Sequence, residues 1–121
     1  DIILEQIKVA ITKLFFHDKE NENLKNSAWL ENEIGIPYYK LRKIFSEKTE
    51  TTIEKYIISQ KIERAKELIR YNQMNFEEIS LELGYKNLSH FSTQFKKIVH
   101  QSLTQYKKNT NSNRKEIDKL L

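Results

Sequence analysis

Residues 30–56 read LENEIGIPYYKLRKIFSEKTETTIEKY, and residues 79–106 read ISLELGYKNLSHFSTQFKKIVHQSLTQY. The two stretches share their spacing of apolar residues, except that the turn after the glycine is one residue longer in the second. In each, an apolar pair four residues apart leads into a glycine, Gly35 or Gly84, which can adopt the positive φ that ends a helix. A further apolar pair at helical spacing follows a short turn. The repeat therefore predicts two helix-turn-helix motifs.

A proline marks the start of the second helix in the first motif. Pro37 is the only proline in the chain, and its fixed φ suits the first position of a helix. We expect the first motif over about residues 27–48, with its second helix beginning at Pro37. In the second motif, over about residues 76–99, we expect Asn87 to cap the second helix.

A long helix is expected to join the two motifs, over about residues 51–71. No glycine or proline interrupts the alternation of apolar and charged residues there. Thr51 and Glu54 have the spacing of a capping box, in which two side chains satisfy unpaired backbone groups at a helix start. The same signature recurs at Asn75 with Glu78 and at Ser102 with Gln105.

The remaining segments complete an all-α chain of about seven helices. Apolar residues at helical spacing predict an amphipathic helix over residues 2–14, and a polar loop is expected over residues 16–26. A short last helix is expected to end near Tyr106, and residues 109–121 are expected to be a disordered tail. Two glycines and one proline are too few turn residues for a sheet or barrel. The sequence thus predicts two helix-turn-helix subdomains, joined by a linker helix, within residues 1–108.

Composition excludes several classes of protein. The 121 residues suit one domain, and the chain has no run of about 18 apolar residues, so no membrane span is expected. The absence of cysteine excludes disulfides and thiolate metal sites and fits a cytoplasmic location. No signal peptide is recognisable. Because the chain starts at Asp1 without methionine, we expect it to be a fragment of a longer protein.

An enzyme is not expected from this sequence. His17, His90 and His100 lack the spacing of metal ligands, and no nucleophile stands in a recognisable catalytic motif. No glycine-rich loop for binding phosphate is present. We therefore expect no catalytic residue, no metal site and no cofactor.

Positive charge is concentrated in one part of the sequence. The chain has a net charge of +4, whereas residues 83–115 contain basic residues and not one acid. The basic residues of this block are Lys86, Lys96, Lys97, Lys107, Lys108, Arg114 and Lys115. A surface that faces a polyanion such as DNA shows this asymmetry. A solubilising face is the alternative explanation.

The second helix of a helix-turn-helix motif enters the major groove of DNA, so its residues outside the core are the candidates for contact. In the first motif these include Tyr39, Lys40, Arg42 and Lys43. Tyr39, Arg42 and Lys43 share one helix face by their spacing of three and four. An arginine there can donate two hydrogen bonds to guanine O6 and N7, so Arg42 is the first candidate for base recognition.

The second motif offers a different set of side chains. Its candidates are Ser89, His90, Thr93, Lys96 and Lys97. Short polar side chains can bind a base edge or a phosphate, whereas lysines act mainly as charge on the DNA backbone. Since this helix contains no arginine, we expect it to contribute less base specificity and more phosphate anchoring.

The expected linker helix has a suitable length for two such contacts. At 1.5 Å per residue, roughly 20 residues span about 30 Å. This is close to the roughly 34 Å between major-groove positions one turn of DNA apart.

Two longer motifs resemble a known family. Residues 61–69 read KIERAKELI on the linker helix, and residues 84–97 read GYKNLSHFSTQFKK. Together with the double helix-turn-helix pattern, they resemble the AraC/XylS family of bacterial transcription regulators over about residues 24–108. The resemblance implies a seven-helix domain that places two recognition helices in adjacent major grooves of double-stranded DNA, and contact with RNA polymerase in activators.

The same resemblance implies individual contacts and partners. By motif position, the contacts to DNA fall on Tyr39, Arg42 and Lys43 in the first motif and on Ser89, His90 and Thr93 in the second. The resemblance also implies a contact to DNA from Lys61, which stands where the family usually has arginine. Family members usually carry a separate sensor or dimerisation domain, so we expect this fragment to be monomeric and a longer protein to dimerise through the missing domain.

The chain departs from the family pattern at a few positions. The family usually has glycine where Glu50 and His100 stand, proline where Leu103 stands, and a basic residue where Thr93 stands. The helices that end at Glu50 and His100 must therefore close without a glycine cap.

One other function is compatible with this fold. A helical protein-interaction module that has lost DNA binding would show acidic residues on the faces of the two recognition helices. None occurs in residues 37–46 or 87–115.

Overall fold

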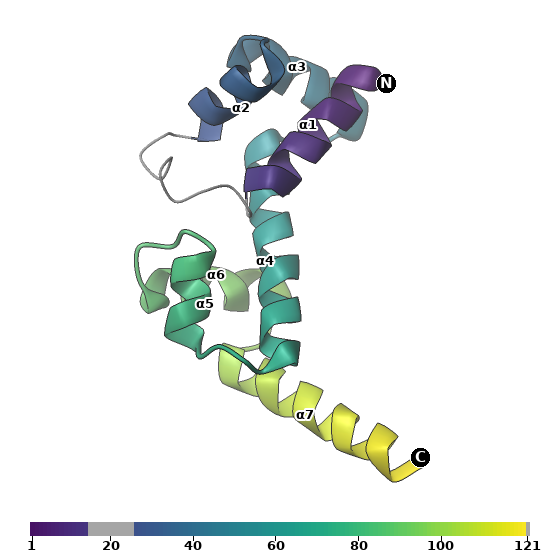
Figure 1. The fold of residues 1–121 in the computed structure, drawn as a ribbon, viewed down its shortest axis with the longest axis vertical. Helices are drawn as coiled ribbons and strands as arrows, with labels where there is room; N and C mark the ends of the chain where they lie inside the picture. Colours follow the sequence, from purple (N-terminus) through teal and green to yellow (C-terminus); the bar gives the residue numbers. More distant parts are fainter. Residues whose placement is uncertain (15–25, 121) are drawn as a thin grey trace. The chain divides into compact units, whose positions relative to one another are not determined.

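The computed structural model describes residues 1–14 and 26–120, with side chains as far as residue 111. Over these residues the chain forms seven α-helices and no strand (Figure 1). The helices are α1 Ile2–Leu14, α2 Asn26–Ile34, α3 Tyr38–Thr49, α4 Ile53–Tyr71, α5 Phe76–Glu82, α6 Leu88–Val99 and α7 Leu103–Leu120. The predicted all-α class and the predicted number of helices are confirmed. The polar loop expected over residues 16–26 lies, apart from Asn26, outside the described residues.

The first compact unit comprises residues 1–60, which hold α1, α2, α3 and the start of α4. Its core is formed by fully buried side chains from all four helices. They are Ile7 and Ile11 of α1, Leu30 of α2, Leu41 and Phe45 of α3, and Ile53 of α4. The ring of Phe45 lies 5.3 Å from the ring of Tyr56, centroid to centroid. These contacts hold α3 by one face.

The second compact unit begins at Lys61 and repeats this arrangement. Phe91 and Phe95 of α6 are fully buried, as Leu41 and Phe45 are on α3. Phe95 lies 5.5 Å from Tyr106, which matches the contact between Phe45 and Tyr56. The repeat seen in the sequence is therefore a repeat of packing: in each unit an aromatic side chain holds the second helix of the motif against the helix that follows it.

Both glycines end a helix in the expected conformation. Gly35 has a φ of +80° and Gly84 has a φ of +82°. A Cβ atom at either position would meet no heavy atom within 4 Å. The backbone angle, not a lack of space, is therefore what favours glycine there.

Three of the predicted helix caps are present, and one is wrong. Asn75 and Glu78 form a capping box, Ser102 and Gln105 exchange the same pair of hydrogen bonds, and Asn87 accepts from the N–H of His90. The predicted box of Thr51 and Glu54 does not form, because α4 begins one residue later than expected. There the Thr52 hydroxyl accepts from the N–H of Lys55 at 3.1 Å, and Glu54 has other partners.

The start of α3 also differs by one residue from the prediction. Pro37 is the residue before the helix, with ψ 142°, and not its first helical residue. Proline has no side chain that can cap a helix, and no such bond is present at Pro37. The carboxylate of Glu31 supplies the cap from α2, accepting from the N–H of Tyr38 at 2.6 Å.

Two helices end on residues that are not glycine, at the positions where the AraC/XylS family, which the sequence resembles, usually has glycine. Glu50 after α3 has a φ of 61° and His100 after α6 has a φ of 65°. In each case the backbone N–H of this residue donates to the carbonyl four residues earlier, Ser46 or Lys96. Both helices thus close in the left-handed conformation, at the steric cost that it imposes on a side chain with a Cβ.

The prediction for the end of the chain is wrong over the described part. The last helix does not end near Tyr106: α7 continues to Leu120, through residues expected to be disordered. No glycine or proline follows Gly84, and asparagine, serine and threonine each cost a helix at most about 0.7 kcal/mol relative to alanine. The Asn109 side chain also donates to the side chain of Gln101 at 3.0 Å.

Replacing Glu50 or His100 with glycine should stabilise the protein. The substitution removes the left-handed strain of about 1–2 kcal/mol but adds backbone entropy to the unfolded chain, so we expect a gain of about 0.5–1 kcal/mol at each site. Urea denaturation of Glu50→Gly and His100→Gly measures it. The control Glu47→Gly, within α3, should lose about 1 kcal/mol. A loss of stability in Glu50→Gly and His100→Gly would contradict the claim that the left-handed backbone is strained at these two residues.

Alkaline pH should destabilise the fold through two tyrosines. Burial raises the pKa of Tyr85 to about 12, and burial with a hydrogen bond to Glu54 raises the pKa of Tyr38 to about 12. Because both values lie above the unfolded value of about 10, each tyrosine contributes stability below about pH 10 that is lost by about pH 12. The free energy of unfolding should therefore fall across this window, and less steeply in Tyr38→Phe and Tyr85→Phe. Equal slopes in wild type and variants would contradict the prediction.

Candidate DNA-binding surface

The exposed face of α3 carries the residues predicted for the first recognition helix. Burial of Leu41 and Phe45 turns the opposite face outward, where Tyr39 has 69% of its surface exposed. Lys40, Arg42 and Lys43 are exposed as well. The structure therefore places all four predicted residues of the first motif at the surface of one helix. No acidic residue occupies the first turn of α3, so the positive end of the helix dipole has no carboxylate of its own helix beside it.

Arg42 has an acidic partner that the sequence did not reveal. Its Nε lies 3.1 Å from Oε1 of Glu54, in the first turn of α4. The same oxygen accepts a hydrogen bond of 3.0 Å from the hydroxyl of Tyr38. Burial, followed by this hydrogen bond, raises the pKa of Tyr38 to about 12. Glu54 thus links the start of α4 to two residues of α3.

The exposed face of α6 brings together most of the residues predicted for the second recognition helix. Ser89, His90, Thr93, Lys96 and Lys97 are all exposed. All of them except Lys96 line a hollow of about 300 Å³, which Gln94 lines as well. Hydroxyl, imidazole, amide and ammonium groups therefore face one space, where they can donate to or accept from a polar ligand.

Lys61 has a different environment from the other predicted residues. Its ammonium lies over the ring of Tyr85, 5.0 Å from the centroid. Burial lowers its pKa below the usual value. The hydroxyl of Tyr85 in turn donates to the side-chain oxygen of Gln94 on α6. Lys61 thus contacts a residue that is hydrogen-bonded to the second recognition helix, and its own contact with DNA stays a prediction.

The sequence does not indicate the pairing of Glu54 with Arg42, because the spacing of Glu54 from Thr51 indicates a helix cap. The hydrogen bond from Tyr85 to Gln94 leaves no signature in the sequence either, since it joins the turn before α6 to the middle of that helix. Only the position of Tyr85 directly after Gly84 indicated that it lies near the motif.

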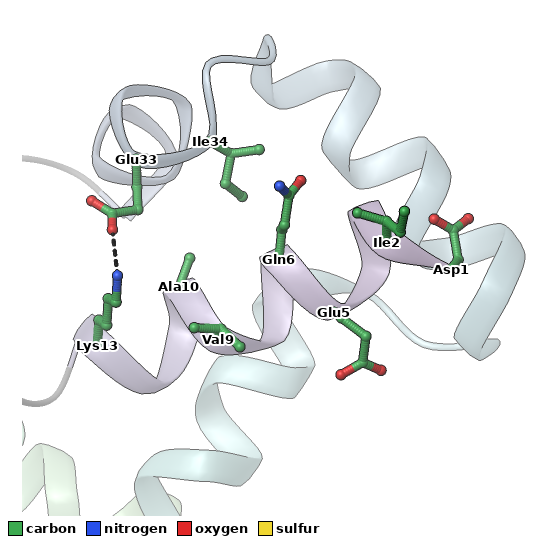
Figure 2. Close-up of a pocket in the computed structure, with 9 residues that line it drawn as sticks. All are labelled: Asp1, Ile2, Glu5, Gln6, Val9, Ala10, Lys13, Glu33 and Ile34. Atoms are coloured by element: carbon green, nitrogen blue, oxygen red, sulfur yellow. Dashed lines mark hydrogen bonds and ion pairs between the residues drawn. The ribbon is translucent and has the colours of Figure 1, made fainter.

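A second hollow, of about 560 Å³, lies along α1 and faces α2 (Figure 2). Its lining is mixed, with Ile2, Val9 and Ile34 beside polar and charged side chains. Lys13 and Glu33 form an ion pair of 3.0 Å in its wall. None of the residues predicted to contact DNA lines it, so it is separate from the candidate surface.

Among the residues whose side chains are described, 1–14 and 26–111, no three histidine, cysteine, aspartate or glutamate residues lie close enough together to hold a metal ion. His17 lies outside the described residues. No helix of the described segments is long and apolar enough to cross a membrane.

Comparison with known proteins supports the assignment of the two motifs. A family model described as a helix-turn-helix domain matches residues 30–109, more than half of the chain. The xylose operon regulatory protein of Escherichia coli K12 is 32% identical over 74 residues, which are 61% of this chain. The chain spans about a fifth of the length of that regulator, since the match covers 19% of it.

Solved structures share the fold. A DNA-binding transcriptional dual regulator from Escherichia coli K-12 superposes with a TM-score of 0.75 at 17% identity, over 91% of this chain and 93% of its own. The DNA-binding domain of AdpA, a global transcriptional factor solved in complex with a target DNA, gives 0.72 at 12% identity, over 90% and 96% of the two chains. With the two matching motifs and their shared packing, these findings show that the chain belongs to the AraC/XylS family and has the fold of its double helix-turn-helix domain.

Proposed function

We propose that this chain is the sequence-specific DNA-binding part of a bacterial transcription regulator, in which α3 and α6 enter adjacent major grooves of double-stranded DNA. One observation carries the proposal. In both motifs the second helix is held to its unit by buried residues, and its exposed side chains are mostly polar or basic, with no acid in the first turn. A helix held in this way can enter a groove without losing its packing.

The two recognition helices have different roles in this proposal. On α3, Arg42 contacts a base, most readily guanine, while Tyr39, Lys40 and Lys43 contact neighbouring bases and phosphates. On α6, Ser89, His90 and Thr93 contact the groove, and Lys96 and Lys97 bind the DNA backbone. Lys61 supports α6 through Tyr85, since its ammonium lies over the Tyr85 ring and Tyr85 donates to Gln94.

The comparisons support double-stranded DNA as the ligand. The AdpA domain, which shares the fold, was solved with its target DNA, and the xylose regulator is named for the operon that it controls. For the longer protein we propose a cytoplasmic transcription regulator without enzymatic activity, with contact to RNA polymerase and dimerisation through a further domain. Residues 1–108 form the DNA-binding domain in this proposal, and the rest of α7 extends it.

Arg42→Ala should reduce sequence preference. Loss of two hydrogen bonds to a guanine should cost about 1–3 kcal/mol on a duplex that the domain has selected from a random pool, with little loss on scrambled duplex. Fluorescence anisotropy titrations on both duplexes measure the difference. Equal losses on the two duplexes would contradict base recognition by Arg42.

Lys97→Ala is the matched control from the second motif. Removal of one phosphate contact should weaken binding to selected and scrambled duplex alike and lower the slope of log K against log salt by about one. Titrations from low to high salt measure this slope. Absence of binding by the wild-type domain to any duplex would favour the protein-interaction module instead.

A further inference from the structure

Among the residues whose side chains are described, Glu54 is the acidic one that pairs with a predicted recognition residue. It belongs to α4, yet its Oε1 lies 3.1 Å from Nε of Arg42 and accepts a 3.0 Å hydrogen bond from Tyr38, both on α3. Among the described residues, the guanidinium of Arg42 has no other ion pair or hydrogen bond. The carboxylate therefore determines the surroundings of the guanidinium in the free protein.

The geometry leaves the DNA-binding end of the arginine open. Guanidinium has five N–H donors in a planar fork, one on Nε and two on each terminal nitrogen. Glu54 is bound at the Nε side, so both terminal nitrogens keep their donors for O6 and N7 of a guanine. The carboxylate thus pairs with the guanidinium on its Nε side and leaves its tip unoccupied.

The carboxylate is itself held in place. Tyr38 packs against the core of the first unit, and its hydroxyl binds the same oxygen that faces Arg42. Glu54 also lies in the first turn of α4, where the helix dipole favours a negative charge. The acceptor for Arg42 is therefore fixed by two elements, although the arginine side chain is 55% exposed.

We propose that Glu54 is a positioning residue for base recognition: it orders Arg42 before DNA arrives and so sharpens the sequence preference of the first recognition helix. This inference rests on the proposed function. An exposed ion pair contributes little to fold stability, so its effect should be seen in binding. A carboxylate close to the groove also repels phosphates, so Glu54 should raise selectivity while lowering the affinity for DNA of any sequence.

Glu54→Ala tests the proposal by the ratio of affinities for selected and scrambled duplex. Loss of the restraint on one long side chain should lower this ratio by about three- to ten-fold. Affinity for scrambled duplex should stay equal or increase. Glu54→Gln keeps an oxygen that can accept from both partners, so its ratio should stay within about three-fold of wild type. Glu47→Ala removes an equal charge from exposed α3 and should leave the ratio unchanged.

A double-mutant cycle shows whether Glu54 acts through Arg42. In the Arg42→Ala background, Glu54→Ala should no longer alter the ratio. An NMR spectrum of the free domain gives a readout that needs no DNA. The Nε–H signal of Arg42 should change its chemical shift when Glu54→Ala removes the carboxylate 3.1 Å from Nε.

Three results would overturn the proposal. One is an unchanged ratio in Glu54→Ala with a rise in affinity equal to that of Glu47→Ala, since Glu54 would then act only as a charge. The second is an increased ratio, which would make Glu54 a competitor of DNA for Arg42. The third is an Arg42 Nε–H signal that Glu54→Ala does not alter. Failure of the proposed function looks different, because the wild-type domain would then show no preference between the two duplexes.

Discussion

The burial of one aromatic face on each recognition helix is the constraint on which the rest of each motif depends. Phe45 on α3 and Phe95 on α6 are completely buried, and each contacts a tyrosine that follows in the chain. A helix with one face fixed in a core has its other face fixed toward solvent. The residues that can meet DNA are therefore determined by packing, and their chemistry is free to differ between the two motifs.

The two motifs differ in this chemistry. The first presents an arginine that is paired with a carboxylate, and this carboxylate also accepts from a tyrosine hydroxyl. The second presents hydroxyl, imidazole and amide groups around a shallow hollow, with lysines beside it. Rigid, directional donors favour recognition of particular bases, whereas ammonium groups mainly supply charge to the backbone. We therefore assign most of the sequence preference to α3 and most of the anchoring to α6.

Most of the fold could be predicted because its signals are local. Glycine at a helix end, asparagine before a helix and apolar residues at helical spacing act within one or two turns, and Gly84, Asn75 and Asn87 all behave as predicted. The errors arise where a partner lies outside the local sequence. Glu31 caps α3 from another helix, which the sequence around Pro37 does not indicate. The polar composition of residues 109–120 predicts disorder, but no helix-breaking residue follows Leu103, and α7 continues to Leu120.

The candidate surface could be predicted in part for the same reason. Helical spacing separates the core positions of α3 and α6 from the exposed ones, so the exposed candidates follow from the sequence. The interaction partners of those candidates cannot be predicted from the sequence. The ion pair of Arg42 with Glu54 and the packing of Lys61 against Tyr85 join separate elements, and only the structure reveals them.

Selection of duplexes from a random pool at physiological salt, with sequencing of the retained DNA, tests the central claim most directly. We expect enrichment of an asymmetric site with two short boxes about one helical turn apart, one of them more strictly defined than the other. A single box would show that α6 does not recognise bases. No enrichment over the starting pool would contradict sequence-specific DNA binding by this chain.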